Sequence, residues 1–347
     1  MPKRITPEKV IDVIWFSVAL TFCWPLPVNS SGTRTLVHKI LQIGSVISAF
    51  MLLPPLLYSI YLHLDDIIIV SECICLFMIV SQCVVQTVIC FVNHDSLQHV
   101  VEEMIICVKQ AREYEMEIFS EHIARCSVFY ASSMVCIYLT ATAFSIGPAA
   151  SPLSFPSEAE YPFPVNYTPV NVIIYTQQSI LSYQCAAHIC LSMFGSLLLW
   201  FTAARFQCLA MELKKTSDVG TYAKQVVDNL RFIVLYAIGV STSALTLCGI
   251  ILLVDVPPMV KIQFVTLCLT VLTEIYVYAW SADYMKDMSI NVSRSAYDAI
   301  WYKQTLEMQK YLSIVLVYQE PLIIFQYLSN TFSIFTALRV VIEDNAE

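Results

Sequence analysis

Two glutamates lie inside apolar stretches long enough to cross a bilayer, and no other residues of the sequence are better placed for chemistry. Glu274 lies near the middle of VLTEIYVYAW, and Glu72 lies within SECICLF. An ionisable group at that depth is costly unless it faces protein or water, so it marks a functional site by default. Each glutamate either contacts the polar group of a ligand or a water-filled cavity, or bonds neighbouring Ser, Thr or Tyr hydroxyls.

The histidines and cysteines predict neither a metal site nor a disulfide framework. The six histidines form no ligand pattern with carboxylates, and His188, which lies inside an apolar stretch, is expected to be a satisfied interior side chain. Nearly all of the thirteen cysteines lie in apolar stretches, where Cys acts as a small packing residue. The sequence has no Gly-rich phosphate loop, nucleophile elbow or paired intramembrane aspartate. We therefore expect no enzyme activity, no cofactor and no metal.

The composition shows what kind of element must position these residues. Of 347 residues, 57% are hydrophobic and only 13% are charged, which is too few charges to cover a soluble fold of this size. Asp and Glu (27) outnumber Lys and Arg (19), which argues against a nucleic-acid partner. The sequence therefore predicts an integral membrane protein in contact with lipid.

Seven apolar stretches predict an all-α membrane protein with seven transmembrane helices. About 20 apolar residues in a helix cross roughly 30 Å of hydrocarbon. The fourth stretch is long enough for its inner end to continue into water as a helix. Few glycines and no internal repeat argue against a secondary transporter. The predicted spans are residues 40–62, 67–92, 126–147, 172–201, 232–254, 262–282 and 321–342.

The basic residues predict the orientation of these spans. With seven spans, 17 of the 19 lysines and arginines fall on the side of the N-terminus, and only Lys261 and Arg339 fall on the other side. Basic residues near span ends stay in the cytoplasm, so we expect a cytoplasmic N-terminus and an extracellular C-terminus. A G-protein-coupled receptor has the reverse orientation.

The segments between the spans carry two further signals. The predicted outer loop, residues 148–169, holds six prolines, no basic residue and a sequon that predicts glycosylation of Asn166. Inside, apolar residues recur at helical spacing between residues 97 and 108. That cytoplasmic helix either packs below the membrane within the chain or joins subunits.

The last span is separated from the helix before it by a proline. Pro321 cannot continue the preceding helix, so residues 303–320 and 321–342 should form two helices with a break between them. Ser329, Asn330 and Ser333 interrupt the otherwise apolar final helix. A helix of this type either hydrogen-bonds to its neighbours or lines water.

Several short motifs occur in a familiar order. They are Cys23-Trp24-Pro25-Leu26 before the first span, then Ser289, Val292, Ala296-Tyr297, Trp301-Tyr302, Lys310, the Gln319/Pro321 break, and Ser333-Ile334-Phe335-Thr336-Ala337-Leu338-Arg339. In type and order these pieces resemble the insect odorant receptor family, a seven-helix family unrelated to G-protein-coupled receptors. The latter remain the alternative, although no Asp-Arg-Tyr follows the third span and no Asn-Pro-x-x-Tyr lies in the seventh.

The resemblance implies a subunit of an odorant-gated, non-selective cation channel that binds small apolar volatiles. It further implies a heterotetramer with the odorant receptor coreceptor in the plasma membrane of a sensory neuron dendrite. The implied layout is a cytoplasmic segment (1–35), helices one to six with the pocket in their outer half (36–302), an anchor helix (303–320), a pore helix (321–342) and an extracellular tail (343–347). The implied site residues are Phe77, Tyr138, Thr142, Tyr183, Ala187 and Tyr276 for the ligand, and Ser333, Ala337 and Val341 for the pore.

Overall fold

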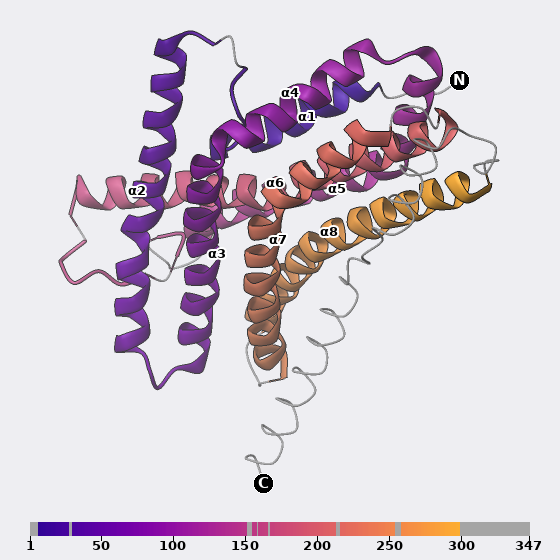
Figure 1. The fold of residues 1–347 in the computed structure, drawn as a ribbon. Helices are drawn as coiled ribbons and strands as arrows, with labels where there is room; N and C mark the ends of the chain where they lie inside the picture. The colour runs from indigo at the N-terminus through magenta and orange to yellow at the C-terminus, as the bar shows by residue number, and fades with distance from the viewer. Residues whose placement is uncertain are drawn as a thin grey trace.

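The computed structural model describes residues 6–27, 30–150, 155–157, 159–165, 167–212, 216–253 and 258–298. Within these ranges every regular element is helical (Figure 1). The elements are α1 (Pro7–Val18), the 3-10 helix η1 (Ala19–Thr21), α2 (Gly32–Leu62), α3 (Ile67–Val92), α4 (His94–Gln110), α5 (Glu113–Ala150), α6 (Val170–Glu212), α7 (Thr216–Leu253) and α8 (Pro258–Asp298).

Six described helices are long and apolar enough to cross a membrane, namely α2, α3, α5, α6, α7 and α8. They confirm the first six predicted spans, and α3 has the predicted bounds of 67–92. The fourth span also continues as one helix beyond its predicted end at residue 201, since α6 ends at Glu212. The predicted seventh span (321–342), the break at Pro321 and the anchor helix (303–320) lie outside the described residues.

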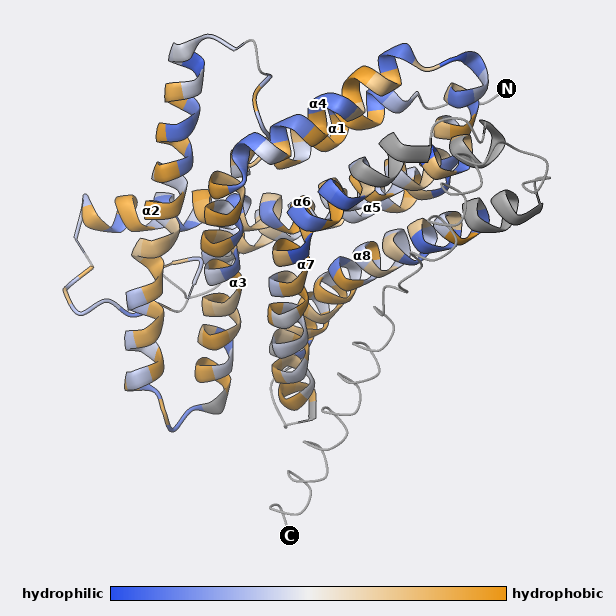
Figure 2. Cartoon of the chain, viewed as in Figure 1, coloured by the Kyte–Doolittle hydropathy of each residue, from blue (hydrophilic) through white to orange (hydrophobic). Residues whose placement is uncertain are grey.

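The outer surfaces of the helices are apolar where lipid would contact them. On α2, Phe50 and Met51 expose 61% and 65% of their surface, and apolar residues cover α2 and α3 along most of their length (Figure 2). A patch of this size on a water-soluble monomer would be an aggregation liability. The surface therefore agrees with the composition in placing these helices in a bilayer.

The helix α6 forms the centre of the bundle. Its most apolar 18-residue stretch is 89% buried, against 28–44% for the other five candidate spans. It packs mainly against α8 and α5. Gly195 permits this close approach, because a Cβ atom at that position would lie 3.1 Å from Cε1 of Tyr278 and 3.3 Å from Cδ2 of Leu230. Both α8 and α7 therefore contact α6 at Gly195, which has no side chain.

The predicted cytoplasmic helix is α4, and its apolar stripe packs within the chain. Leu97, Val101, Met104 and Val108 are each at most 4% exposed and belong to the main core cluster. The neighbours of α4 are α3, α6 and α7. The interpretation that this stripe is covered within the chain is therefore confirmed.

The helix α1 was not predicted; the sequence indicated only a cytoplasmic segment there. Pro7 supplies the fixed φ that suits a first helical turn, and Ile14 and Val18 recur four residues apart on one face. Both side chains are at most 2% exposed, and α1 packs on α5 and α6. The spacing of Val10, Ile14 and Val18 was the signal available in the sequence.

An ion pair and a cation–π contact join the C-terminal part of α6 to α4 and α7. The guanidinium of Arg205 donates to Glu103 Oε1 at 2.7 Å and lies 4.6 Å from the ring centroid of Tyr222, whose hydroxyl donates to Val100 O. The two charged side chains are only 14% and 32% exposed.

Replacement of Arg205 by Gln is expected to lower the free energy of unfolding by about 1.5–3 kcal/mol, because it leaves the Glu103 carboxylate half-buried without its cation. The matched control is Arg125→Gln, whose pair with Glu121 is 51% and 58% exposed and so should change the free energy by less than about 1 kcal/mol. Thermal unfolding in lipid nanodiscs measures both. Equal losses for the two variants would show that burial does not strengthen the Arg205 pair.

Candidate functional site

A hollow lies among four helices in the membrane part of the bundle. Its wall consists of residues within 79–83 of α3, 185–189 of α6, 240–244 of α7 and 267–274 of α8, and we name it the Glu274 hollow. Most of the wall is apolar, including Ile79, Ile189 and Val240. In this conformation the free space admits a water-sized group rather than a whole odorant.

Glu274 is the acidic side chain of this wall. It is 5% exposed; its Oε1 accepts from Gln82 Nε2 and its Oε2 accepts from Ser241 Oγ, each at 2.9 Å. The prediction that this glutamate bonds a neighbouring hydroxyl is confirmed. Sequence reasoning missed Gln82 and Ser241, although both are polar residues in otherwise apolar spans.

His188 lies in the same wall with one satisfied and one unsatisfied nitrogen. Its Nε2 lies 3.2 Å from Thr87 Oγ1, and the Thr87 hydroxyl donates to Cys83 O at 2.8 Å. Since the Thr87 proton is used in that bond, Nε2 is the protonated nitrogen, and Nδ1 of the neutral ring is an acceptor. Nδ1 has no partner among the described residues, so the expectation of a satisfied histidine holds only for Nε2.

Three of the six predicted ligand residues come together between α5 and α6. The hydroxyl of Tyr183 donates to Thr142 Oγ1 at 3.1 Å, and the Thr142 hydroxyl donates to the backbone oxygen of Tyr138 at 2.8 Å. The Tyr138 hydroxyl reaches the backbone oxygen of Ser17 at the end of α1. These residues form a polar seam, in which each hydroxyl is already partnered.

The other three predicted residues lie elsewhere in the bundle. Phe77 packs in the cluster between α2 and α3, and Ala187 is fully buried in α6. Tyr276 is 50% exposed and belongs to an aromatic group with Phe129 and Trp280, whose centroids lie 5.3 and 5.7 Å away. None of the six borders the Glu274 hollow.

The predicted outer loop is folded onto the N-terminal part of α6. The backbone N–H of Ser157 donates to Gln178 Oε1 at 3.0 Å, and Gln178 Nε2 donates to the Tyr161 hydroxyl at 3.1 Å. Glu160 pairs with His63 at 2.8 Å, which joins this loop to the turn between α2 and α3. The predicted glycosylation site, Asn166, lies outside the described residues.

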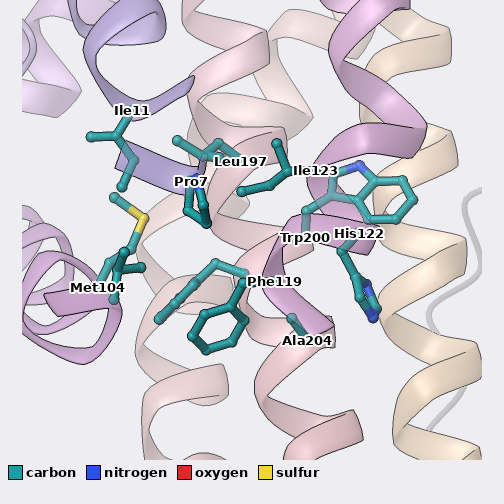
Figure 3. Close-up of a pocket in the computed structure, with 11 residues that line it drawn as sticks. Pro7, Ile11, Met104, Phe119, His122, Ile123, Leu197, Trp200 and Ala204 are labelled. Atoms are coloured by element: carbon teal, nitrogen blue, oxygen red, sulfur yellow. The ribbon is translucent and has the colours of Figure 1, made fainter. Parts of the chain in front are cut away.

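A second hollow lies among α1, α4, α5 and α6 (Figure 3). Its wall is apolar and aromatic: Ile11 comes from α1, Met104 from α4, Phe119 from α5 and Trp200 from α6. His122 borders it, with Nε2 against Gln207 Oε1. We name it the α1 hollow; the polar atoms available to a ligand are fewer than in the Glu274 hollow.

The cysteines and histidines of the described residues assemble no candidate metal centre of three or more ligands. All thirteen cysteines lie within the described residues, none of them forms a disulfide, and most are buried. The predicted pore residues, Ser333, Ala337 and Val341, lie outside the described residues.

Comparison with known proteins identifies a family model and a fold. The family model described as 7tm Odorant receptor matches residues 219–336. The insect olfactory receptor OR5 from Machilis hrabei superposes with a TM-score of 0.75 and 14% identity, covering 96% of this chain and 97% of that one. The structure of the same receptor in complex with eugenol superposes with a TM-score of 0.73 and 14% identity, covering 97% and 98%. No curated protein sequence matches this chain.

The family match agrees with the motifs near the C-terminal end of the sequence. The family model spans α7, α8 and the stretch that carries the C-terminal motifs, and the six described spans follow the olfactory receptor fold. Residues 219–336 thus match the odorant receptor family model, and the chain shares the fold of an insect olfactory receptor.

Proposed function

We propose that this chain is the odorant-binding subunit of an odorant-gated, non-selective cation channel that it forms with the odorant receptor coreceptor. The match of the odorant receptor family model to residues 219–336 carries this proposal. The similar receptor from Machilis hrabei has been solved with eugenol, a small volatile, which supports the same ligand class here.

The mechanism begins with a small apolar volatile that enters the outer half of the bundle, where Phe77, Tyr138, Thr142, Tyr183, Ala187 and Tyr276 are the proposed lining. A ligand of roughly ten heavy atoms supplies only several kcal/mol. Only the part of this energy that differs between the closed and open states moves the gate. The proposed gate is the final helix, with Ser333, Ala337 and Val341 facing the pore.

The proposed orientation has the N-terminus in the cytoplasm and the C-terminus outside, in the plasma membrane of a sensory neuron dendrite. The distribution of basic residues supports it, since Arg205 and Lys224 lie at the ends of α6 and α7 that meet α4. In this orientation the loop at residues 155–165 and a glycan on Asn166 would be extracellular.

The function is tested by whole-cell recording from cells that express the chain with and without the coreceptor, under a broad volatile panel and with G-protein signalling blocked. We expect fast inward current that needs the coreceptor and survives the block. Surface labelling of epitope tags provides the control, with the C-terminal tag accessible on intact cells and the N-terminal tag hidden.

The rival function is a seven-helix G-protein-coupled chemoreceptor. It would give the opposite tag accessibility and a response abolished by the block. Current that does not depend on the coreceptor would refute the proposed assembly but not the odorant-gated channel.

A further inference from the structure

Two side chains in the wall of the Glu274 hollow have an acceptor position that is not filled, and the described wall contains no cation. The carboxylate of Glu274 has roughly four acceptor positions, of which the amide of Gln82 and the hydroxyl of Ser241 occupy two. Nδ1 of His188 is a further acceptor, and the ring is 2% exposed. No Lys or Arg belongs to the described wall. The hollow is therefore short of donors.

An unmet acceptor at this depth is costly, because hydrocarbon offers it no water. Because Glu274 lies in the wall of the hollow, its carboxylate gains most from a ligand that donates a hydrogen bond. A ligand that has only acceptors, such as a ketone or an ester, would form no hydrogen bond with the carboxylate of Glu274 or with Nδ1 of His188.

The rest of the wall limits the guest in size and polarity. Ile79, Ile189, Val240 and Leu267 surround the polar groups with hydrocarbon. The guest must therefore carry its donor at one end of a short apolar body, and these side chains must shift to admit that body.

We propose that the Glu274 hollow receives the polar end of a small volatile that donates hydrogen bonds, a primary amine or an alcohol, and that Glu274 is its acceptor. The ligand's polar end then lies in a hollow distinct from the six residues predicted from the family. This inference rests on the proposed function only in taking the ligand to be an odorant. It makes Glu274 a specificity-determining residue.

The test measures binding directly, so that it does not depend on channel opening. The full-length chain in lipid nanodiscs is unfolded thermally over a concentration series of heptylamine, 1-heptanol or 2-heptanone, and the rise of the midpoint gives an apparent dissociation constant for each probe. We expect the amine and the alcohol to bind about tenfold or more tightly than the ketone.

Two substitutions of Glu274 distinguish the effect of its charge from the effect of its acceptor oxygens on ligand binding. Glu274→Gln keeps one acceptor oxygen and removes the charge, so it should abolish the preference for heptylamine and retain that for 1-heptanol. Glu274→Met removes both oxygens and should abolish both preferences. The matched control is Thr273→Val on the next position of α8, whose hydroxyl bonds its own helix at Leu269 O; it should leave all three constants unchanged.

The outcomes show whether the Glu274 hollow binds a volatile that donates hydrogen bonds or holds only water. Equal binding of the three probes to the unsubstituted chain would mean that the hollow holds only water and would overturn the inference. The inference is also overturned if Glu274→Gln still prefers heptylamine. This measurement on Glu274→Gln decides the question even if Glu274→Met does not fold. If the chain prefers donor ligands but gives no volatile-evoked current, the proposed channel is refuted and the inference about Glu274 stands. If it gives volatile-evoked current but shows no preference for donor ligands, the channel stands and the inference is refuted.

Discussion

Replacement of Trp200 by Ala is expected to cost about 3–5 kcal/mol of folding free energy and to abolish delivery of the protein to the cell surface. Trp200 is 1% exposed and stacks on Tyr284, with centroids 4.3 Å apart. Its indole N–H donates to the Tyr130 hydroxyl at 3.1 Å. Truncation therefore opens a cavity where α5, α6 and α8 meet and leaves a buried hydroxyl without its donor.

The matched control for this prediction is Trp15→Ala in α1. Trp15 is 49% exposed, so its loss should cost about 1 kcal/mol or less. Quantitative surface biotinylation and thermal unfolding in nanodiscs measure the two variants side by side. Normal surface amounts of the Trp200 variant would show that this aromatic group does not hold the three helices together.

Replacement of Gly195 by Leu is expected to destabilise the fold by about 3 kcal/mol through overpacking. Even the first added carbon would lie 3.1 Å from the ring of Tyr278 and 3.3 Å from Leu230, and both neighbours are at most 4% exposed. The three further carbons of Leu have no free space, so α6 must move away from α8 and α7. A lowered unfolding midpoint and reduced surface amount are the expected readouts.

Gly44→Leu in α2 tests whether the loss comes from crowding rather than from changing a membrane helix. A Cβ atom at Gly44 would meet nothing within 4 Å. This substitution should be neutral or slightly stabilising, since Gly is a poor helix former. If both glycine variants unfold at the same temperature, the close approach at Gly195 is not a constraint.

The hydrophobic pattern was sufficient to predict most of the fold. Apolar runs of span length appear directly in the sequence, and six of the seven predicted spans fall on described helices. The stripe of Leu97, Val101 and Met104 likewise specified α4 and its buried face. These predictions succeed because bilayer thickness and helical periodicity are local rules that need no knowledge of neighbours. The same rules did not predict α1, because a short amphipathic helix gives a weaker hydrophobic pattern than a membrane span.

The candidate site was less predictable for a physical reason. Glu274 stood out because a carboxylate is rare at that depth, but its partners Gln82 and Ser241 lie on α3 and α7, far away in sequence. The register of α8 against these helices brings the three together. The same reason governs the predicted ligand residues, of which three lie together and three lie elsewhere: Tyr183 contacts Thr142 on α5, whereas Tyr276 packs against Phe129 and Trp280.

By itself the sequence determined the membrane class, six of the spans, the helix α4 and the resemblance to the odorant receptor family, because composition, period and motif are properties of the chain alone. Only the tertiary structure decided which polar side chains share a hollow, since the rotation of each helix about its axis selects the face that meets its neighbours. That rotation depends on close contacts such as Gly195 on Tyr278. The packing of α6 at the centre thus places Glu274 and His188 in the wall of one hollow.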